Sequence, residues 1–128
     1  MAKNHESMPM HEQTITEIEK DIFRYETSLQ QWTLQKKMAE EGLELSKILL
    51  AQSNKHLRRV QHDIDEGIIE NLNGEDLDHA ILGIKIAERG LRDATSLVNS
   101  TDRIIEWFQV VKFRAEQDLK TAKEKQKM

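Results

Sequence analysis

The feature that most constrains this chain is a pair of heptad patterns, one on each side of residues 71–74. Before these residues, two interleaved series of mostly apolar side chains recur with the coiled-coil period of seven. They are Ile15, Ile22, Leu29, Lys36, Leu43, Leu50, Leu57 and Ile64, and Ile18, Tyr25, Trp32, Ala39, Ser46, Ser53 and Val60. Series with this spacing occupy the a and d positions of a coiled coil, which face a partner helix.

A second pair of series follows residues 71–74. Its a positions are Leu77, Ile84, Leu91, Val98, Ile105, Lys112 and Leu119, and its d positions are Ala80, Ala87, Ala94, Thr101, Phe108, Ala115 and Ala122. Two such helices joined by a short turn fold back on one another. We therefore predict an all-α fold, a long antiparallel coiled-coil helical hairpin with its turn at residues 71–74.

The side chains of the two helices are also complementary in size. When the hairpin is closed around residues 71–74, large residues face small ones in six successive layers, as close packing favours. The predicted pairs are Leu57 with Ala87, Ser53 with Leu91, Leu50 with Ala94, Ser46 with Val98, Leu43 with Thr101 and Ala39 with Ile105. This register also places Lys36 opposite Phe108 and Trp32 opposite Lys112. Each of these lysines is then expected to lie against an aromatic ring.

The hairpin is expected to span residues 14–122. Thr14 and Glu17 have the spacing of a capping box, which marks the start of a helix. The preceding residues 1–13 contain the only proline and no apolar period, so we predict a flexible tail there. A basic tail is predicted at residues 123–128. The histidines and methionines of residues 1–13 are soft ligands, but a flexible tail offers no second shell, and we expect no metal site.

Both helices carry further apolar residues on the side away from their a and d positions. They are Leu34, Met38, Leu45 and Ile48 in the first helix and Leu82, Ile86, Leu97, Ile104, Trp107 and Val111 in the second. A two-helix seam cannot bury these side chains as well. We expect them to mediate self-association, with two hairpins dimerising into a four-helix bundle. The alternative is a groove kept open for a different protein.

Charge changes sharply around the predicted turn. No lysine or arginine lies between Arg59 and Lys85, whereas seven acidic residues do. The predicted partner-binding surface consists of Asp63, Asp65, Glu66, Glu70, Glu75, Asp76 and Asp78 around Ile68, Ile69 and Leu72. Acidic residues at the start of the second helix also suit its dipole, so a merely solvated end is the alternative.

No pattern of residues indicates catalysis. The chain has no cysteine, its five glycines match no phosphate-binding loop, and His62 and His79 are at positions facing away from the seam. We expect a non-enzymatic protein without cofactor or metal. No run of about 18 apolar residues and no signal-peptide core is present, so we expect no membrane insertion and a cytoplasmic location.

The sequence predicts a non-catalytic, regulatory protein-binding module. In the first hypothesis, a homodimeric hairpin acts as an adapter, chaperone or inhibitor of a second protein that has a basic or mixed surface. In the second, its carboxylates imitate a phosphate backbone and occupy the basic groove of a DNA-handling or RNA-handling enzyme, as an inhibitor from a mobile element would. A structural scaffold is the third. We do not expect direct nucleic-acid binding, because the net charge of the chain is −4.

Overall fold

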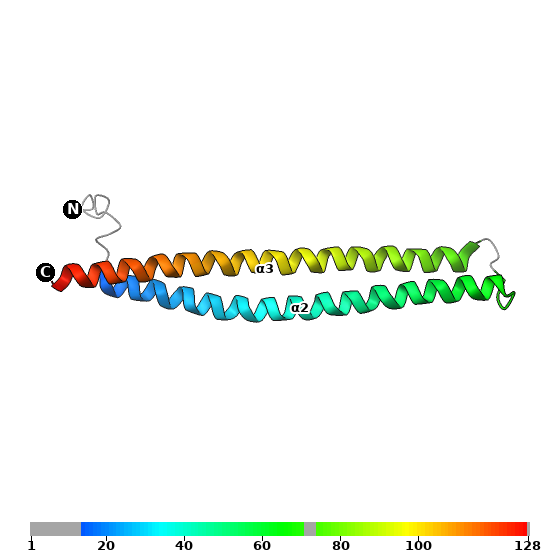
Figure 1. The fold of residues 1–128 in the computed structure, drawn as a ribbon, viewed down its shortest axis with the longest axis horizontal. Coiled ribbons are helices and arrows are strands. Elements are labelled where there is room, and N and C mark those ends of the chain that lie inside the picture. The colour runs from blue at the N-terminus through cyan, green and yellow to red at the C-terminus, as the bar shows by residue number, and fades with distance from the viewer. Residues whose placement is uncertain (1–13, 71–73, 128) are drawn as a thin grey trace. The chain divides into compact units, whose positions relative to one another are not determined.

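The computed structural model describes residues 14–70 and 74–127 and contains two long helices packed against each other as a hairpin (Figure 1). Helix α2 comprises the 51 residues Ile15–Asp65, and helix α3 comprises the 53 residues Glu75–Lys127. The prediction of an all-α helical hairpin is confirmed. The tail predicted at residues 1–13 and all but Gly74 of the turn predicted at residues 71–74 lie outside the described residues.

Helix α2 begins where its capping residue predicts. The Thr14 hydroxyl oxygen accepts a hydrogen bond from the Glu17 amide at 3.2 Å, and the Thr14 carbonyl accepts one from the Ile18 amide at 3.1 Å. Thr14 thus satisfies one of the amide groups that have no partner inside the first helical turn. The predicted helix start is confirmed.

Burial along both helices follows the predicted heptads. Each predicted a and d position is buried or partly buried, from Ile15 to Ile64 in α2 and from Leu77 to Ala122 in α3. The most buried side chains are those of Ile18, Ile22, Ala39, Val60, Ala80 and Thr101, none more than 9% exposed. Thr101 is the polar member of this set, and its hydroxyl donates to the carbonyls of Val98 at 2.8 Å or Leu97 at 3.1 Å. Its burial therefore leaves no unsatisfied group.

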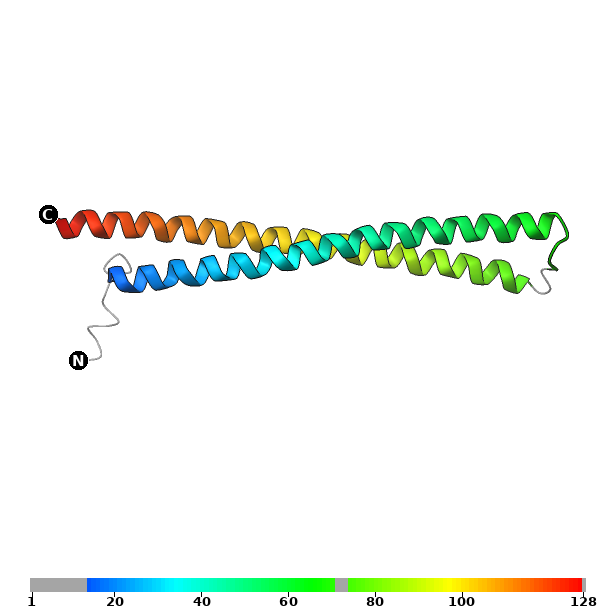
Figure 2. The same ribbon diagram turned by 90° about the horizontal axis from the view of Figure 1, so that it is seen from below.

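The contacts divide the chain into two compact units. Figure 2 shows helices α2 and α3 from a second side. The hairpin unit is Lys36–Thr101, which holds the second part of α2 and the first part of α3. The terminal unit joins Met1–Gln35 with Asp102–Met128, and its described residues belong to the first part of α2 and the last part of α3.

The register within the terminal unit differs from the predicted one. The rings of Tyr25 and Phe108 have their centroids 6.4 Å apart. The predicted register places Phe108 opposite Lys36, which is about 16 Å along the helix axis from Tyr25 at ~1.5 Å per residue. Tyr25 also lines a hollow together with Val111 and Ala115. These neighbours place Ile22 opposite Ala115, one heptad away from the prediction.

The hairpin unit shows the same shift. Ser53 and His56 of α2 line a hollow together with Ala80 and Gly83 of α3. The predicted register puts Ala80 opposite Ile64, two turns further along α2. The helices are instead paired one heptad away, with Leu57 opposite Ala80. The layers predicted within the hairpin unit, and the contact of Trp32 with Lys112 predicted in the terminal unit, are therefore wrong.

The end of α2 explains why the predicted register fails. Leucines at a positions of α2 meet alanines at d positions of α3 in either register, so residue size does not distinguish the two. The predicted register would place Leu77 opposite Gly67, where α2 has already ended. In the observed register Leu77 lies opposite Val60, which is 8% exposed. The shift adds this apolar layer to the seam.

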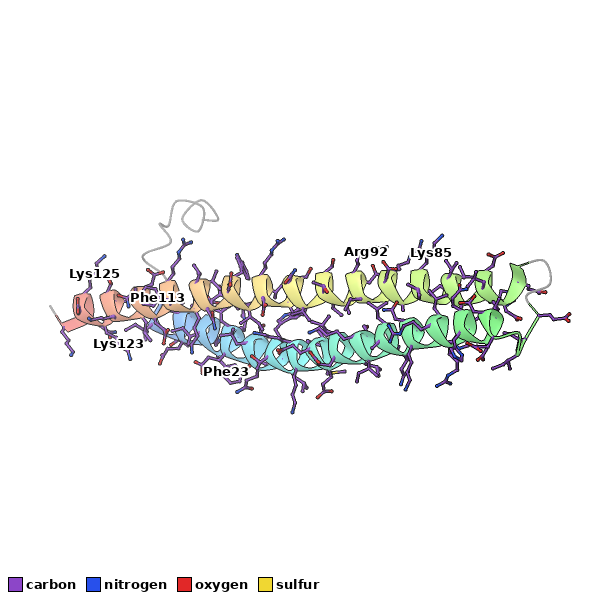
Figure 3. All side chains as sticks on the ribbon, turned by 45° about the vertical axis from the view of Figure 1, so that its right-hand side comes forward. Phe23, Lys85, Arg92, Phe113, Lys123 and Lys125 are labelled. Atoms are coloured by element: carbon purple, nitrogen blue, oxygen red, sulfur yellow. The ribbon has the colours of Figure 1, made fainter. Side chains whose placement is uncertain are left out.

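Helix α3 continues further than predicted. It includes Lys123 and Lys125, whose side chains are labelled in Figure 3, and it ends at Lys127. The residues predicted as a basic tail at 123–128 are therefore helical through Lys127. Cations near the carboxyl end of a helix interact favourably with its dipole, which accounts for the extension.

The register can be tested by cross-linking within one chain. Lys47, Glu88 and Thr95 are exposed residues on the same flank of the seam, and the chain has no native cysteine. The observed register places Lys47 beside Glu88, whereas the predicted register places it beside Thr95. A short bismaleimide should link a Lys47→Cys/Glu88→Cys variant several-fold faster than a Lys47→Cys/Thr95→Cys variant, as measured by mass spectrometry of the monomer. Faster linkage of the second variant would restore the predicted register.

Candidate functional site

A glycine cap shapes the acidic end of the hairpin unit. Gly67 has φ of +72°, in the left-handed region, directly after α2. The Ile68 amide donates to the Asp63 carbonyl at 2.8 Å, and the Gly67 amide donates to the Ile64 carbonyl at 3.1 Å. This pair of hydrogen bonds is the Schellman motif, which satisfies carbonyl groups at a helix end. The chain therefore leaves the helix at Asp65.

This cap is a feature that the sequence prediction missed. The first helix was expected to continue to Glu70, and the reversal was assigned to residues 71–74. A glycine followed at once by Ile68 is a recognisable signal for a helix end, because glycine adopts positive φ without a steric cost. Gly74 also has positive φ, +71°, immediately before α3 begins. The described residues of the connection are therefore 66–70 and Gly74.

The predicted partner-binding residues are gathered around this connection. Asp65, Glu66, Ile68, Glu70, Glu75, Asp76 and Asp78 are exposed, Asp63 and Ile69 are partly buried, and Leu72 lies outside the described residues. We call the described members of this set the acidic tip. The described contacts of its carboxylates include a hydrogen bond from Gln61 to Asp65 at 3.0 Å and a 3.4 Å contact between His62 and Asp63. Ile68 is 66% exposed and adds an apolar side chain beside these charges.

A groove runs along one flank of the seam in the hairpin unit. Two adjoining hollows share Leu49, Ser53 and Gly83. Their further lining residues are Ser46, Gln52 and His56 of α2 and His79, Ala80, Ile86, Ala87 and Gly90 of α3. The lining is therefore largely apolar or small, and we call this surface the groove.

Small residues keep the groove open. A methyl group built on Gly83 or Gly90 would meet no atom within 4 Å. Both glycines occupy g positions of α3, and Leu49 and His56 occupy g positions of α2. In an antiparallel pair the g positions of both helices line the same flank of the seam, and the e positions line the other. The e positions of the hairpin unit are Glu40, Lys47, Asn54, Gln61, Ile81, Glu88 and Thr95. The groove thus lies on the more apolar flank.

The residues predicted to mediate self-association are mostly exposed. Leu34, Met38, Leu45, Ile48, Leu82, Ile86, Leu97 and Trp107 are all more than half exposed, whereas Ile104 and Val111 are partly buried. Ile86 lines the groove. Trp107 packs edge-on against Phe108, with ring centroids 4.9 Å apart. The prediction missed Phe23 and Phe113, which lie on the outside of α2 and α3 in the terminal unit and are 70% and 60% exposed (Figure 3).

Within residues 14–70 and 74–127, no three acidic or histidine side chains are grouped so that they could hold a metal ion. Neither described helix has an apolar stretch long enough to cross a bilayer. The chain matches no family model, and no curated protein or solved structure is significantly similar to it. The surfaces themselves must therefore carry any functional assignment.

Alanine substitutions at Gly67, in the helix cap, and at Gly42, inside a helix, should change the stability of the protein in opposite directions. A methyl group at Gly67 or Gly42 would meet no atom within 4 Å, but only Gly67 has positive φ. Gly67→Ala should lower the free energy of unfolding by ~1 kcal/mol, the cost of a left-handed alanine. Gly42→Ala should raise it by about 0.5–1 kcal/mol through helix propensity. Denaturant titration at one protein concentration measures both, and changes of equal sign would contradict the assigned cap.

Proposed function

We propose that this protein is a non-catalytic protein-interaction module that self-associates as a homodimer through the flank bearing the groove. The observation that carries the proposal is the exposure of large apolar side chains in and beside a groove with a small-residue floor. In dimeric form the hairpin would act as an adapter, chaperone or inhibitor of a second protein. A cytoplasmic location is part of the proposal and is compatible with a chain that lacks cysteine.

The exposed apolar area gives self-association a driving force. Leu45 is 58% exposed, Leu49 is 49% exposed and Ile86 is 64% exposed. Complete burial of such a side chain contributes about 1.5–3 kcal/mol, so covering the exposed half contributes roughly 1 kcal/mol each. Several side chains of this kind are needed to offset the cost of association. Micromolar dimerisation corresponds to about −8 kcal/mol.

The lining of the groove supports a binding role over a catalytic one. Its members are leucine, isoleucine, alanine, glycine and serine, with glutamine and two histidines. The Ser46 hydroxyl donates to the Gly42 carbonyl at 2.9 Å, within its own helix. Apolar side chains around a floor of small residues are suited to receive another protein surface, because close approach increases packing contacts.

Self-association can be tested with two substitutions on one helix. Leu49 lines the groove, whereas Ala51 is exposed on the opposite flank of α2. Leu49→Asp should weaken dimerisation at least tenfold, because it places a charge in an apolar interface. Ala51→Asp adds the same charge to the same helix and should change the dissociation constant less than threefold. Equilibrium sedimentation provides both constants, and a folded wild-type monomer at tens of micromolar would overturn the proposal.

A nucleic-acid mimic is the second candidate, and the acidic tip is the observation that favours it. Asp65, Glu66 and Glu70 are exposed on a segment that has no lysine or arginine from Val60 to Ile84. A basic groove of a nucleic-acid enzyme would be attracted to such a segment. A scaffold role, in which the hairpin has no discrete target, is the remaining alternative.

If the protein acts as a nucleic-acid mimic, its binding to an enzyme should depend strongly on salt concentration. Binding to an immobilised DNA-handling or RNA-handling enzyme should fall at least tenfold between 50 and 300 mM salt, since the contact is electrostatic. A variant with Asp65→Asn, Glu66→Gln and Glu70→Gln should lose this binding. Capture that persists in that variant, or that is insensitive to salt, would exclude mimicry and favour an apolar contact.

A further inference from the structure

The two flanks of the seam in the hairpin unit differ in charge. On the groove flank, the c and g positions from Met38 to His56 of α2 and from His79 to Ser100 of α3 include one charged residue, Asp93. A surface with so little charge resembles the centre of a protein interface. On the other flank, Lys85 and Arg92 project from α3 into solvent (Figure 3). The e and b positions there include Lys37, Glu40, Glu44, Lys47, Arg58, Asp78, Lys85, Glu88 and Arg92.

The groove flank of α3 has a line of side chains that complements itself. His79, Ile86 and Asp93 are spaced by seven residues, so they lie on one line along the helix at c positions. All three are exposed. A two-fold axis beside Ile86 would bring His79 of each copy opposite Asp93 of the other. An imidazole N–H can donate a hydrogen bond to a carboxylate, so both of these pairs are favourable.

Glycines allow two copies of α3 to come close along this line. Gly83 and Gly90 occupy the neighbouring g positions, three residues before and four residues after Ile86. The same axis therefore brings Gly83 of each copy opposite Gly90 of the other. A methyl group built on either glycine meets no atom within 4 Å, so the space above them is open to a second helix. Close approach there increases the packing contacts of Ile86, which is 64% exposed.

We propose that the groove flanks of two copies pack against each other in an antiparallel arrangement, with the two-fold axis beside Ile86. This inference rests on the proposed self-association and specifies its geometry. On α2, the same axis places Leu49 opposite Gln52 of the second copy. It also places Arg59 opposite Gly42, where the long side chain can reach solvent at the edge of the contact.

The acidic tip favours the antiparallel direction. In a parallel pairing of two hairpin units, both acidic tips would lie at the same end, and their carboxylates would repel each other. In the antiparallel pairing the two tips lie at opposite ends of the contact and stay uncovered. The dimer can therefore bind two basic partners at once, as an adapter does.

The extent of the contact suits a weak dimer. It ends where a carboxylate comes opposite an apolar side chain, with Asp76 opposite Leu97 on α3 and Asp63 opposite Met38 on α2. Between these limits the copies overlap over about 18 residues of α2, or ~27 Å, and two side-by-side helices are roughly 20 Å wide. The contact then covers about 540 Å² per copy, or ~1,100 Å² in total, just above the ~1,000 Å² expected of a specific interface.

Two single substitutions test the pairing of His79 with Asp93. In its homodimer, His79→Asp places a carboxylate opposite Asp93 twice. Asp93→Lys removes the acceptor and places an ammonium group opposite His79 twice. Both positions are exposed, so both variants should fold, and circular dichroism checks that their helicity equals that of the wild type. Sedimentation velocity of each variant alone, and of their equimolar mixture, measures the dissociation constants.

The arrangement predicts rescue on mixing. Each variant alone should dimerise about fivefold more weakly or worse, because two contacts change at once. In the heterodimer, one contact joins the new carboxylate to the new ammonium group, and the other keeps the original His79 and Asp93. Its dissociation constant should therefore be within about threefold of the wild-type value. The control Arg92→Asp, on the other flank of α3, should change the wild-type constant less than threefold.

Each other result would overturn the inference. Variants that dimerise like the wild type would indicate that α3 does not meet α3 along this line. Weakened variants that do not rescue each other would indicate that His79 and Asp93 do not face each other. A control as weak as the two variants would indicate an effect of net charge alone. A monomeric wild type would overturn the proposed self-association as well, whereas the other outcomes leave self-association intact.

Discussion

The antiparallel packing of two heptad seams is the interaction on which everything else in this protein depends. Leucines at a positions of one helix lie against alanines of the other, which allows close approach of the backbones. The resulting core is one line of side chains along each helix, and the most buried members are still 3–9% exposed. A core this narrow leaves most of each helix surface in contact with solvent. The chemistry of those outer surfaces therefore decides what the protein can bind.

The sequence determines which face of each helix is buried more firmly than it determines how the two helices are aligned along their axes. Each a and d residue is buried or partly buried as predicted, because the heptad period alone selects the side that faces the partner. The predicted alignment along the helix axes differs from the observed one by one heptad. Serines and alanines recur in step with the heptad, so each shift by one repeat restores the match of large with small side chains. Gly67 and its capping hydrogen bonds supply the missing information, since they end α2 before the position that would face Leu77 in the predicted register.

The two candidate surfaces differ in how far a sequence can reveal them. The acidic tip is evident from composition, because its carboxylates are close together along the chain. The groove is formed by residues such as Leu49 and Gly83, which come from different helices and meet only in the observed register. The glycines could therefore be assigned to this groove only once the alignment of α2 and α3 was known. Phe23 and Phe113 were missed for another reason, since neither belongs to the apolar lines that the periodicity selected.

Gly83 and Gly90 also affect the motions of the protein. Glycine inside a helix lowers its stability by about 0.5–1 kcal/mol relative to alanine, and these glycines have no atoms packed over them that would compensate. The helical turns beneath the groove are therefore less stable than they would be with alanine at both positions. Local unfolding of the helix begins more easily there. A protein surface that covers the groove binds only while these helical turns are intact. Its binding therefore raises the local stability of the helix through mass action. The groove thereby couples association to the rigidity of the helix that forms it.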